Sequence, residues 1–289
     1  MPKKIRADPN SITELKLSEL HPFKNHPFKV LDDELMQQTI DSISQVGVLS
    51  PAVVRPDPDG GYEIISGHRR LHACKAAGLE TMPVIVKNLT DDEAVIFMVD
   101  SNLQRENILP SERALAYKMK SEALKHQGKR KNSTLDQVGP KSWTMEKLSA
   151  ETGESPTQIK RYIRLAELIP ELLEKVDEKE ISLTPAVELA YLTQDEQQGF
   201  LDAMEYSQNN PSLSQAQRIR KLSQNGTCTV KAMREIMSED KKGDIDKIMI
   251  GTDEIKKYFP RSFTPRQMRD TIFKLLDAWV KKRQKKNER

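Results

Sequence analysis

The sequence predicts an α+β N-terminal domain, then an all-α domain that contains a helix-turn-helix, and last a small, mostly helical C-terminal module. Three observations predict this. Strand-like segments alternate with helical ones only before residue 110, two short helices flank a glycine turn within residues 143–168, and the net charge changes sign along the chain. We therefore expect domains at 1–110, 111–225 and 226–289.

The composition bounds the class of protein. The chain has 289 residues, of which 31% are charged and 37% hydrophobic, which suits two or three domains with well-solvated surfaces. No stretch approaches the roughly 20 apolar residues of a membrane helix, and the N-terminus lacks the apolar run of a secretory signal. Cys74 and Cys228 are too few for a disulfide framework or a CxxC zinc site. We expect a cytoplasmic protein without a membrane partner.

Six segments of the first hundred residues carry a clear pattern. Runs of β-branched residues between turn signals predict strands, and apolar residues at helical spacing predict helices. Thr90 and Glu93 form a capping box before the third helix. The predicted strands are 51–55, 62–66 and 83–87, and the predicted helices are 32–46, 68–78 and 90–100.

From residue 111 the pattern is almost entirely helical. Polar, glycine- and proline-containing segments at 127–142 and 224–244 predict flexible connections. One short strand is predicted at 246–250. The predicted helices are 111–126, 143–151, 155–168, 185–192, 194–206, 214–223 and one from Thr264 to the tail.

The net charge of +3 conceals blocks of opposite sign. Residues 1–110 carry −4 and residues 165–225 carry −6, whereas residues 111–164 carry +6 and residues 226–289 carry +7. Two basic modules in a nearly neutral chain indicate two surfaces that could face a polyanion such as double-stranded DNA.

Residues 145–164 have the length and punctuation of a helix-turn-helix. Gly153 lies in the turn, and Leu148, Ile159 and Ile163 are expected to form the core between the helices. The second helix of such a motif enters the major groove with its N-terminal residues facing base edges. An ordinary pair of bundle helices is the alternative. The expected DNA contacts are Ser155, Thr157, Gln158, Lys160, Arg161 and Arg164.

The segment SGHRRLHA (66–73) lies between a predicted strand and a predicted helix. Gly67 would let the backbone approach a ligand, the helix N-terminus offers free N–H groups, and Arg69 and Arg70 add positive charge. The segment is either a phosphate cradle or a solvated basic turn.

The segment DSNLQRENILPSER (100–113) gathers polar residues at the end of a helix. Asp100 and Asn102 offer the hard oxygen ligands that suit Mg²⁺. The alternative is a capped junction between two helices that ends at Pro110.

These motifs, in this order, resemble the ParB-type partition proteins of plasmids, chromosomes and mobile elements, over roughly residues 12–225. The resemblance implies a ParB/sulfiredoxin-like N-terminal domain that binds CTP with Mg²⁺ and closes a homodimer into a clamp sliding on DNA. It also implies a ParA-type ATPase as partner and association with the nucleoid. The nucleotide-binding residues it implies are Gly67, His68, Arg69, Arg70, Asn102, Gln104 and Arg105.

The chain departs from the family's motifs at two glutamates, which are replaced by His68 and Ser101. Whether CTP is hydrolysed, and so whether the protein is a CTPase, therefore stays open. Sulfiredoxin chemistry needs a cysteine directly before the His-Arg pair, where this chain has Gly67.

Two other functions are compatible with the same DNA-binding core. One is a transcriptional repressor or regulator of a mobile element. The other is a nuclease, for which Asp91, Asp92 and Glu93 are the nominal metal ligands, although these residues more simply begin a helix.

Overall fold

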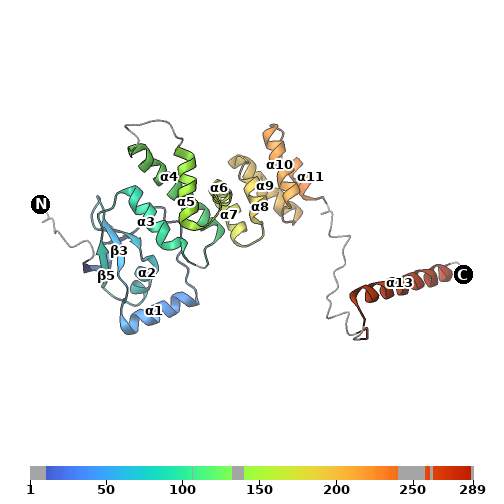
Figure 1. Ribbon diagram of the computed structural model, residues 1–289, viewed down its shortest axis with the longest axis horizontal. Helices are drawn as coiled ribbons and strands as arrows, with labels where there is room; N and C mark the ends of the chain where they lie inside the picture. The colour runs from blue at the N-terminus through green and yellow to red at the C-terminus, as the bar shows by residue number, and fades with distance from the viewer. Residues whose placement is uncertain (1–10, 106, 132–139, 240–257, 261–262, 288–289) are drawn as a thin grey trace. The chain divides into compact units, whose positions relative to one another are not determined.

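The computed structural model describes residues 11–105, 107–131, 140–239, 258–260 and 263–287 (Figure 1). The chain forms two compact units, residues 1–238 and 239–289, which are treated separately below. Within the described ranges, no helix is long and apolar enough to cross a membrane.

The first unit begins with a mixed five-stranded sheet in the order β1-β5-β3-β4-β2. The pairs β1–β5 and β3–β4 are antiparallel, whereas β5–β3 and β4–β2 are parallel. The strands are β1 (Ile12–Lys16), β2 (Leu20–Pro22), β3 (Ala52–Pro56), β4 (Tyr62–Ser66) and β5 (Thr81–Val86).

Helices cover both faces of this sheet, and consecutive residues of β4 show how. Because side chains alternate along a strand, Ile64 packs with α1 (Glu34–Val46) and α2 (His68–Ala76), whereas Ile65 packs with α3 (Asp91–Leu103). Both isoleucines are fully buried. The predicted α+β domain is confirmed, with the predicted strands and helices found at β3, β4, β5, α1, α2 and α3.

The two edge strands, β1 and β2, were not predicted. β1 lies mostly exposed, and β2 is only three residues long, so neither carries the alternation of apolar residues that marks a buried strand. Backbone pairing with β5 and β4 holds them in place, and the sequence pattern does not report such pairing.

A long helix, α4, joins the sheet to the helical part. Its residue Ala116 packs with α3, while Tyr117 and Leu124 pack with the next two helices. The helices of this part are α4 (Pro110–Lys131), α5 (Pro140–Thr152), α6 (Pro156–Leu165), α7 (Pro170–Asp177), α8 (Leu183–Leu189), α9 (Gln194–Ser207), α10 (Leu213–Gln224) and α11 (Val230–Met237).

Three predictions for this part were wrong or incomplete. α7 was missed, α4 continues five residues into the predicted loop at 127–142, and α5 begins within it; residues 132–139 lie outside the described ranges. The predicted flexible segment 224–244 contains α11, because Met233, Ile236 and Met237 bury their side chains in the bundle core. An eight-residue helix is too short for its periodicity to stand out in the sequence.

In the second unit the predicted terminal helix is confirmed as α13 (Pro265–Asn287), with the Thr264 hydroxyl accepting a hydrogen bond from the Gln267 N–H at 3.3 Å. Several large apolar side chains of α13 are exposed, among them Leu275, Leu276 and Trp279. The strand predicted at 246–250 lies outside the described residues.

Candidate nucleic-acid interface and anion site

Helices α5 and α6 form the predicted helix-turn-helix. Gly153 ends α5 with a φ of +72°, a conformation that costs glycine little, and its N–H donates to the Ser149 carbonyl at 2.9 Å. Leu148 and Ile159 are completely buried between the helices, and Ile163 packs against them. This core, which the sequence predicted, holds α6 at a fixed angle against α4 and α5.

The N-terminal half of α6 presents the polar side chains expected of a recognition helix. The Ser155 hydroxyl caps the helix by accepting from the Gln158 N–H at 3.2 Å, and Pro156 begins it. Thr157 and Lys160 are exposed, and Gln158 is half-buried. Thr157 and Lys160 are therefore open to an external partner, and Ser155 serves mainly to shape the helix start.

The two arginines of α6 contact side chains that the sequence analysis did not link to this helix. Arg161 donates to the Thr184 hydroxyl at 2.9 Å, and the guanidinium of Arg164 lies 4.4 Å from the centre of the Tyr191 ring. Arg220 stacks on the same ring at 3.6 Å. No sequence signal links Thr184 or Tyr191 to α6, because only the folded chain brings α8 beside it.

The glycine turn before α2 is the centre of the candidate anion site. Gly67 has a φ of +119° and, as a glycine, has no side chain that could cap the helix, so the first N–H groups of α2 need other partners. Arg69 lies on the first turn and makes a long 3.5 Å contact with Asp33. Burial has the largest effect on the pKa of Arg105 and lowers it, nearby Glu112 raises it, and the charge of Arg69 lowers it, so the two guanidinium groups lie near each other. Two cations beside a helix N-terminus favour a bound anion.

Two residues of the same turn are occupied within the protein. The Nε2 atom of His68 accepts from the Phe23 N–H at 3.3 Å, and burial, His26 and Arg105 lower its pKa to about 3, so His68 is neutral. Arg70 donates to the carbonyls of Ser50 and Pro51 at 2.5 and 2.6 Å. His68 thus supplies no charge to a phosphate, and Arg70 holds the loop before β3.

The predicted joint metal site at Asp100 and Asn102 does not fit this geometry. Residues two apart on a helix point to different sides. The Asp100 carboxylate pairs with the completely buried Lys120, which also contacts Glu151. Asn102 is buried, and its amide donates to the Met98 carbonyl at 2.8 Å.

Gln104 ends α3 on the Asp100 side. It is exposed and lines the same two cavities as Asp100. The structure therefore brings Arg69 and Arg105 near each other at the turn of Gly67 as a candidate anion site, whereas Gln104 and Asp100 line two other cavities.

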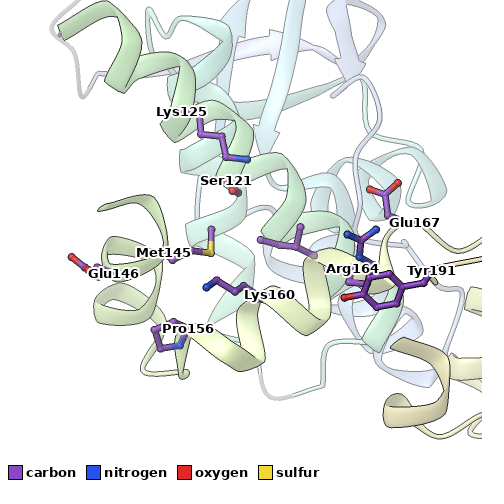
Figure 2. A pocket seen from close by; sticks show the side chains of 10 residues that line it. Ser121, Lys125, Met145, Glu146, Pro156, Lys160, Arg164, Glu167 and Tyr191 are labelled. Carbon is purple, nitrogen blue, oxygen red and sulfur yellow. The ribbon is translucent and has the colours of Figure 1, made fainter. Parts of the chain in front are cut away.

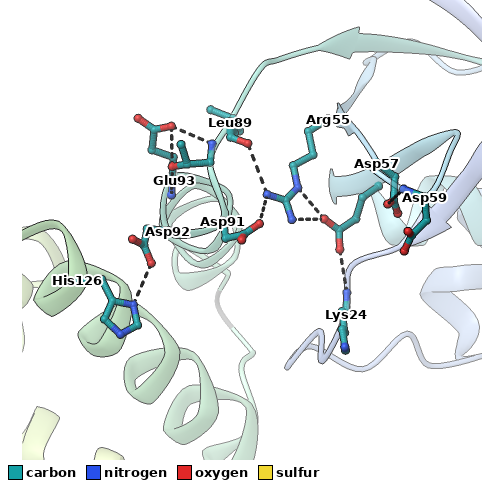
Figure 3. Close-up of polar contacts among 11 residues, drawn as sticks. Lys24, Arg55, Asp57, Asp59, Leu89, Asp91, Asp92, Glu93 and His126 are labelled. Carbon is teal, nitrogen blue, oxygen red and sulfur yellow. Dashed lines mark hydrogen bonds and ion pairs between the residues drawn. The ribbon is translucent and has the colours of Figure 1, made fainter. Parts of the chain in front are cut away.

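The carboxylates at the start of α3 bind three different partners (Figure 3). The Asp91 carboxylate accepts a hydrogen bond from Arg55 at 2.7 Å, and Asp92 contacts His126 at 3.2 Å. Glu93 forms the capping box with Thr90, and the backbone and side-chain hydrogen bonds from Thr90 lower the pKa of Glu93. In the described part of the chain, no group of three or more His, Cys, Asp or Glu side chains could hold a metal ion. These acids position α3.

Arg55 extends this network to the sheet, since it also binds Glu63 of β4 at 2.7 Å. The start of α3 is thereby fixed to β3 and β4, which sets where its other end, with Arg105, lies relative to α2. Cys74 is fully buried in the sheet core, and burial raises the pKa of its thiol, as suits a packing role.

Two family models match the chain. The ParB N-terminal domain matches residues 1–103, and the ParB HTH domain matches residues 134–225. Together they contain the glycine turn before α2 and the helix-turn-helix.

The chain is also similar to individual proteins. The chromosome-partitioning protein Spo0J of Thermus thermophilus is 34% identical over 59% of this chain and 56% of its own length, so the chain spans just over half of that relative. A nucleoid occlusion protein of Listeria monocytogenes is 32% identical over 79% of this chain and 76% of its own. A solved structure of truncated Caulobacter crescentus ParB complexed to the centromeric parS site covers 78% of this chain and 98% of that one, at 22% identity and a TM-score of 0.41.

Proposed function

The chain belongs to the ParB family, and from this premise we propose that it is a sequence-specific DNA-binding protein that segregates a plasmid, mobile element or chromosome. The observation that carries the proposal is the helix-turn-helix itself. α6 rests on a buried core, is capped by Ser155 at its N-terminus and exposes Thr157 and Lys160. These are the features with which such a helix contacts base edges and phosphates in a major groove.

CTP is the proposed ligand of the anion site. The support from the chain's own residues is the gathering of Arg69 and Arg105 beside the uncapped N-terminus of α2. A triphosphate is the kind of anion that two guanidinium groups and free N–H groups hold well. The proposal covers binding of CTP and not its hydrolysis, and it assigns no Mg²⁺ to Asp100 and Asn102.

We further propose that the protein works as a homodimeric clamp on the nucleoid, with a ParA-type ATPase as partner. The exposed apolar side chains of α13 support self-association, because a soluble surface seldom leaves several large apolar residues in contact with water. The basic charge of residues 226–289 supports non-specific contact with DNA.

The deciding experiment is sequencing of the DNA that the protein binds in its host. We expect a few sharp sites flanked by a continuous signal over the neighbouring DNA, which a sliding clamp produces. The Lys160→Ala variant should bind every site more weakly. Its matched control is Lys75→Ala on α2, which should change the binding at none of them. A flat profile over the whole genome would refute sequence-specific binding.

A role in nucleoid occlusion is the second candidate, because the relative with that name aligns with 79% of this chain. Deleting the gene separates the two candidates. Loss of the replicon from the population supports partition, whereas division septa placed over unsegregated DNA support occlusion.

A further inference from the structure

A cavity of about 710 Å³ opens beside the helix-turn-helix, on the α6 face that carries Lys160 and Arg164 (Figure 2). Helices α4, α5 and α6 bound it, and Tyr191 closes one end. This volume falls within the range of cavities that bind small organic molecules.

One residue of the wall points to a missing partner. Ser121 of α4 is only 1% exposed, and its hydroxyl has no hydrogen-bond partner among the residues that the structure describes. An unpaired buried hydroxyl costs free energy, and alanine in its place would avoid that cost. A group that enters the cavity could accept the hydrogen bond of Ser121.

The charges around the cavity favour an anion. Lys125 and Lys160 line it, and neither forms an ion pair with a carboxylate in the described ranges. Arg164 adds a third cation, whose guanidinium carbon lies 4.4 Å from the centre of the Tyr191 ring. Of the two acids, Glu167 is paired with Lys118 at 3.0 Å, and Glu146 points away from the cavity in Figure 2.

The remaining wall is apolar and aromatic. Met145 lies between the two lysines in Figure 2, and Ile163 and Tyr191 also line the cavity. Such a wall suits the ring of a ligand, while the cations and the serine suit a doubly charged phosphate. DNA does not fit this description, because a duplex is too wide to enter a cavity of about 710 Å³ and could contact only the side chains at its rim.

We propose that this cavity binds a small aromatic phosphate monoester, with the phosphate between Lys125, Lys160 and Ser121 and the ring against Met145 and Ile163. The binding itself does not depend on the function proposed above. One consequence does: since Lys160 and Arg164 are also expected DNA contacts, an occupied cavity should compete with DNA.

The test is titration of the full chain with phenyl phosphate, followed by calorimetry and by the methyl resonances of Met145 and Ile163. Binding should be saturable, and phenol and inorganic phosphate should each bind at least tenfold more weakly. Lys160→Ala should weaken binding at least tenfold. Lys221→Ala, an exposed lysine of α10 outside the cavity, should leave it unchanged.

Ser121→Ala is the sharpest variant. It should weaken the binding of phenyl phosphate at least fivefold, while the melting temperature stays equal or rises. A lower melting temperature would mean that the hydroxyl is satisfied inside the folded protein, and the proposal would fail. It also fails if phenyl phosphate does not saturate, or if inorganic phosphate binds equally well.

Competition is measured separately, by adding phenyl phosphate to the complex with the host-derived DNA site. Saturable binding of phenyl phosphate without any DNA binding would refute the proposed function and leave the cavity assignment standing. DNA binding without saturable phenyl phosphate would do the reverse.

Discussion

The imidazole rings of His26 and His68 lie 3.7 Å apart, with their planes tilted by 36°. The Nδ1 atom of His26 lies 2.7 Å from the Phe28 carbonyl, so it carries the proton there, while Nε2 of His68 accepts from Phe23. This stacked pair anchors the start of α2 to the segment after β2. Because both pKa values are lowered, chiefly by burial, the pair is built for two neutral rings.

The histidine pair predicts a pH dependence of stability. The pKa of His68 is about 3 in the folded chain and near 6.5 when unfolded, so the unfolded state binds more protons between these values. Stability should therefore fall as the pH falls below about 6.5, with a loss of about 2 kcal/mol at pH 5 from His68 alone. Urea denaturation at several pH values measures this. His68→Gln should flatten the profile, substitution of the exposed His21 by Gln should not, and equal slopes in both variants would contradict the prediction.

The turn before α2 predicts a contrast between two adjacent arginines. Arg69→Ala should weaken CTP binding at least tenfold and leave the melting temperature unchanged, since the long contact with Asp33 is the only ion pair of Arg69 among the described residues. Arg70→Ala should instead cost about 1–3 kcal/mol of stability, because it removes the donor to two carbonyls. Calorimetric titration and thermal melts test both. Equal loss of CTP binding without loss of stability in Arg70→Ala would show that Arg70 binds the nucleotide directly.

Two glycines predict different costs for the same substitution. Both have positive φ, but a Cβ at Gly67 would lie 2.7 Å from the Cβ of Ala52, whereas a Cβ at Gly153 would meet nothing within 4 Å. Gly153→Ala should cost about 1 kcal/mol from backbone strain alone, and Gly67→Ala about 2–4 kcal/mol, because β3 must also move. Chemical denaturation should show this order, and equal costs would argue against the close packing.

Buried Lys120 predicts an asymmetry in the ion-pair cluster of α3, α4 and α5. Replacing Asp100 and Glu151 together by their amides would leave an uncompensated buried charge, which costs about 3–5 kcal/mol. Lys120→Met should cost about 2 kcal/mol less than this double variant, because both carboxylates are partly exposed and can be hydrated. Urea denaturation of the two proteins decides the order.

The recognition helix predicts separable effects on DNA. Arg161→Ala should reduce affinity for the specific site by about 1–3 kcal/mol and relax its sequence preference, if the arginine leaves Thr184 to read a base. Lys160→Ala should instead reduce the affinity for specific and random DNA by a similar factor and lower the salt dependence of binding, as loss of a phosphate contact does. Affinities for specific and random duplexes at several salt concentrations measure both. An unchanged preference in Arg161→Ala would assign Arg161 to holding α8.

Much of the fold followed from local patterns. The strands at β3, β4 and β5, the capping boxes and the helix-turn-helix all rest on neighbouring residues, such as Ser155 before Pro156 or Thr90 before Glu93. The missed elements were those without such a pattern. β1 and β2 are edge strands held by backbone pairing, and α7 and α11 are short helices stabilised by the bundle core.

The sequence by itself determined the family's motif order, the position of the glycine turns and the placement of basic residues on α6. Tertiary structure alone decided which of these residues are free. In the folded chain Arg70 donates to two carbonyls and Asp100 pairs with Lys120 on the opposite side from Asn102. Ser121 is buried in the cavity that Lys160 also lines, with no hydrogen-bond partner in the described part of the chain. The physical reason is that local conformation depends on neighbouring residues, whereas the availability of a side chain depends on burial and on partners that lie far away in the chain.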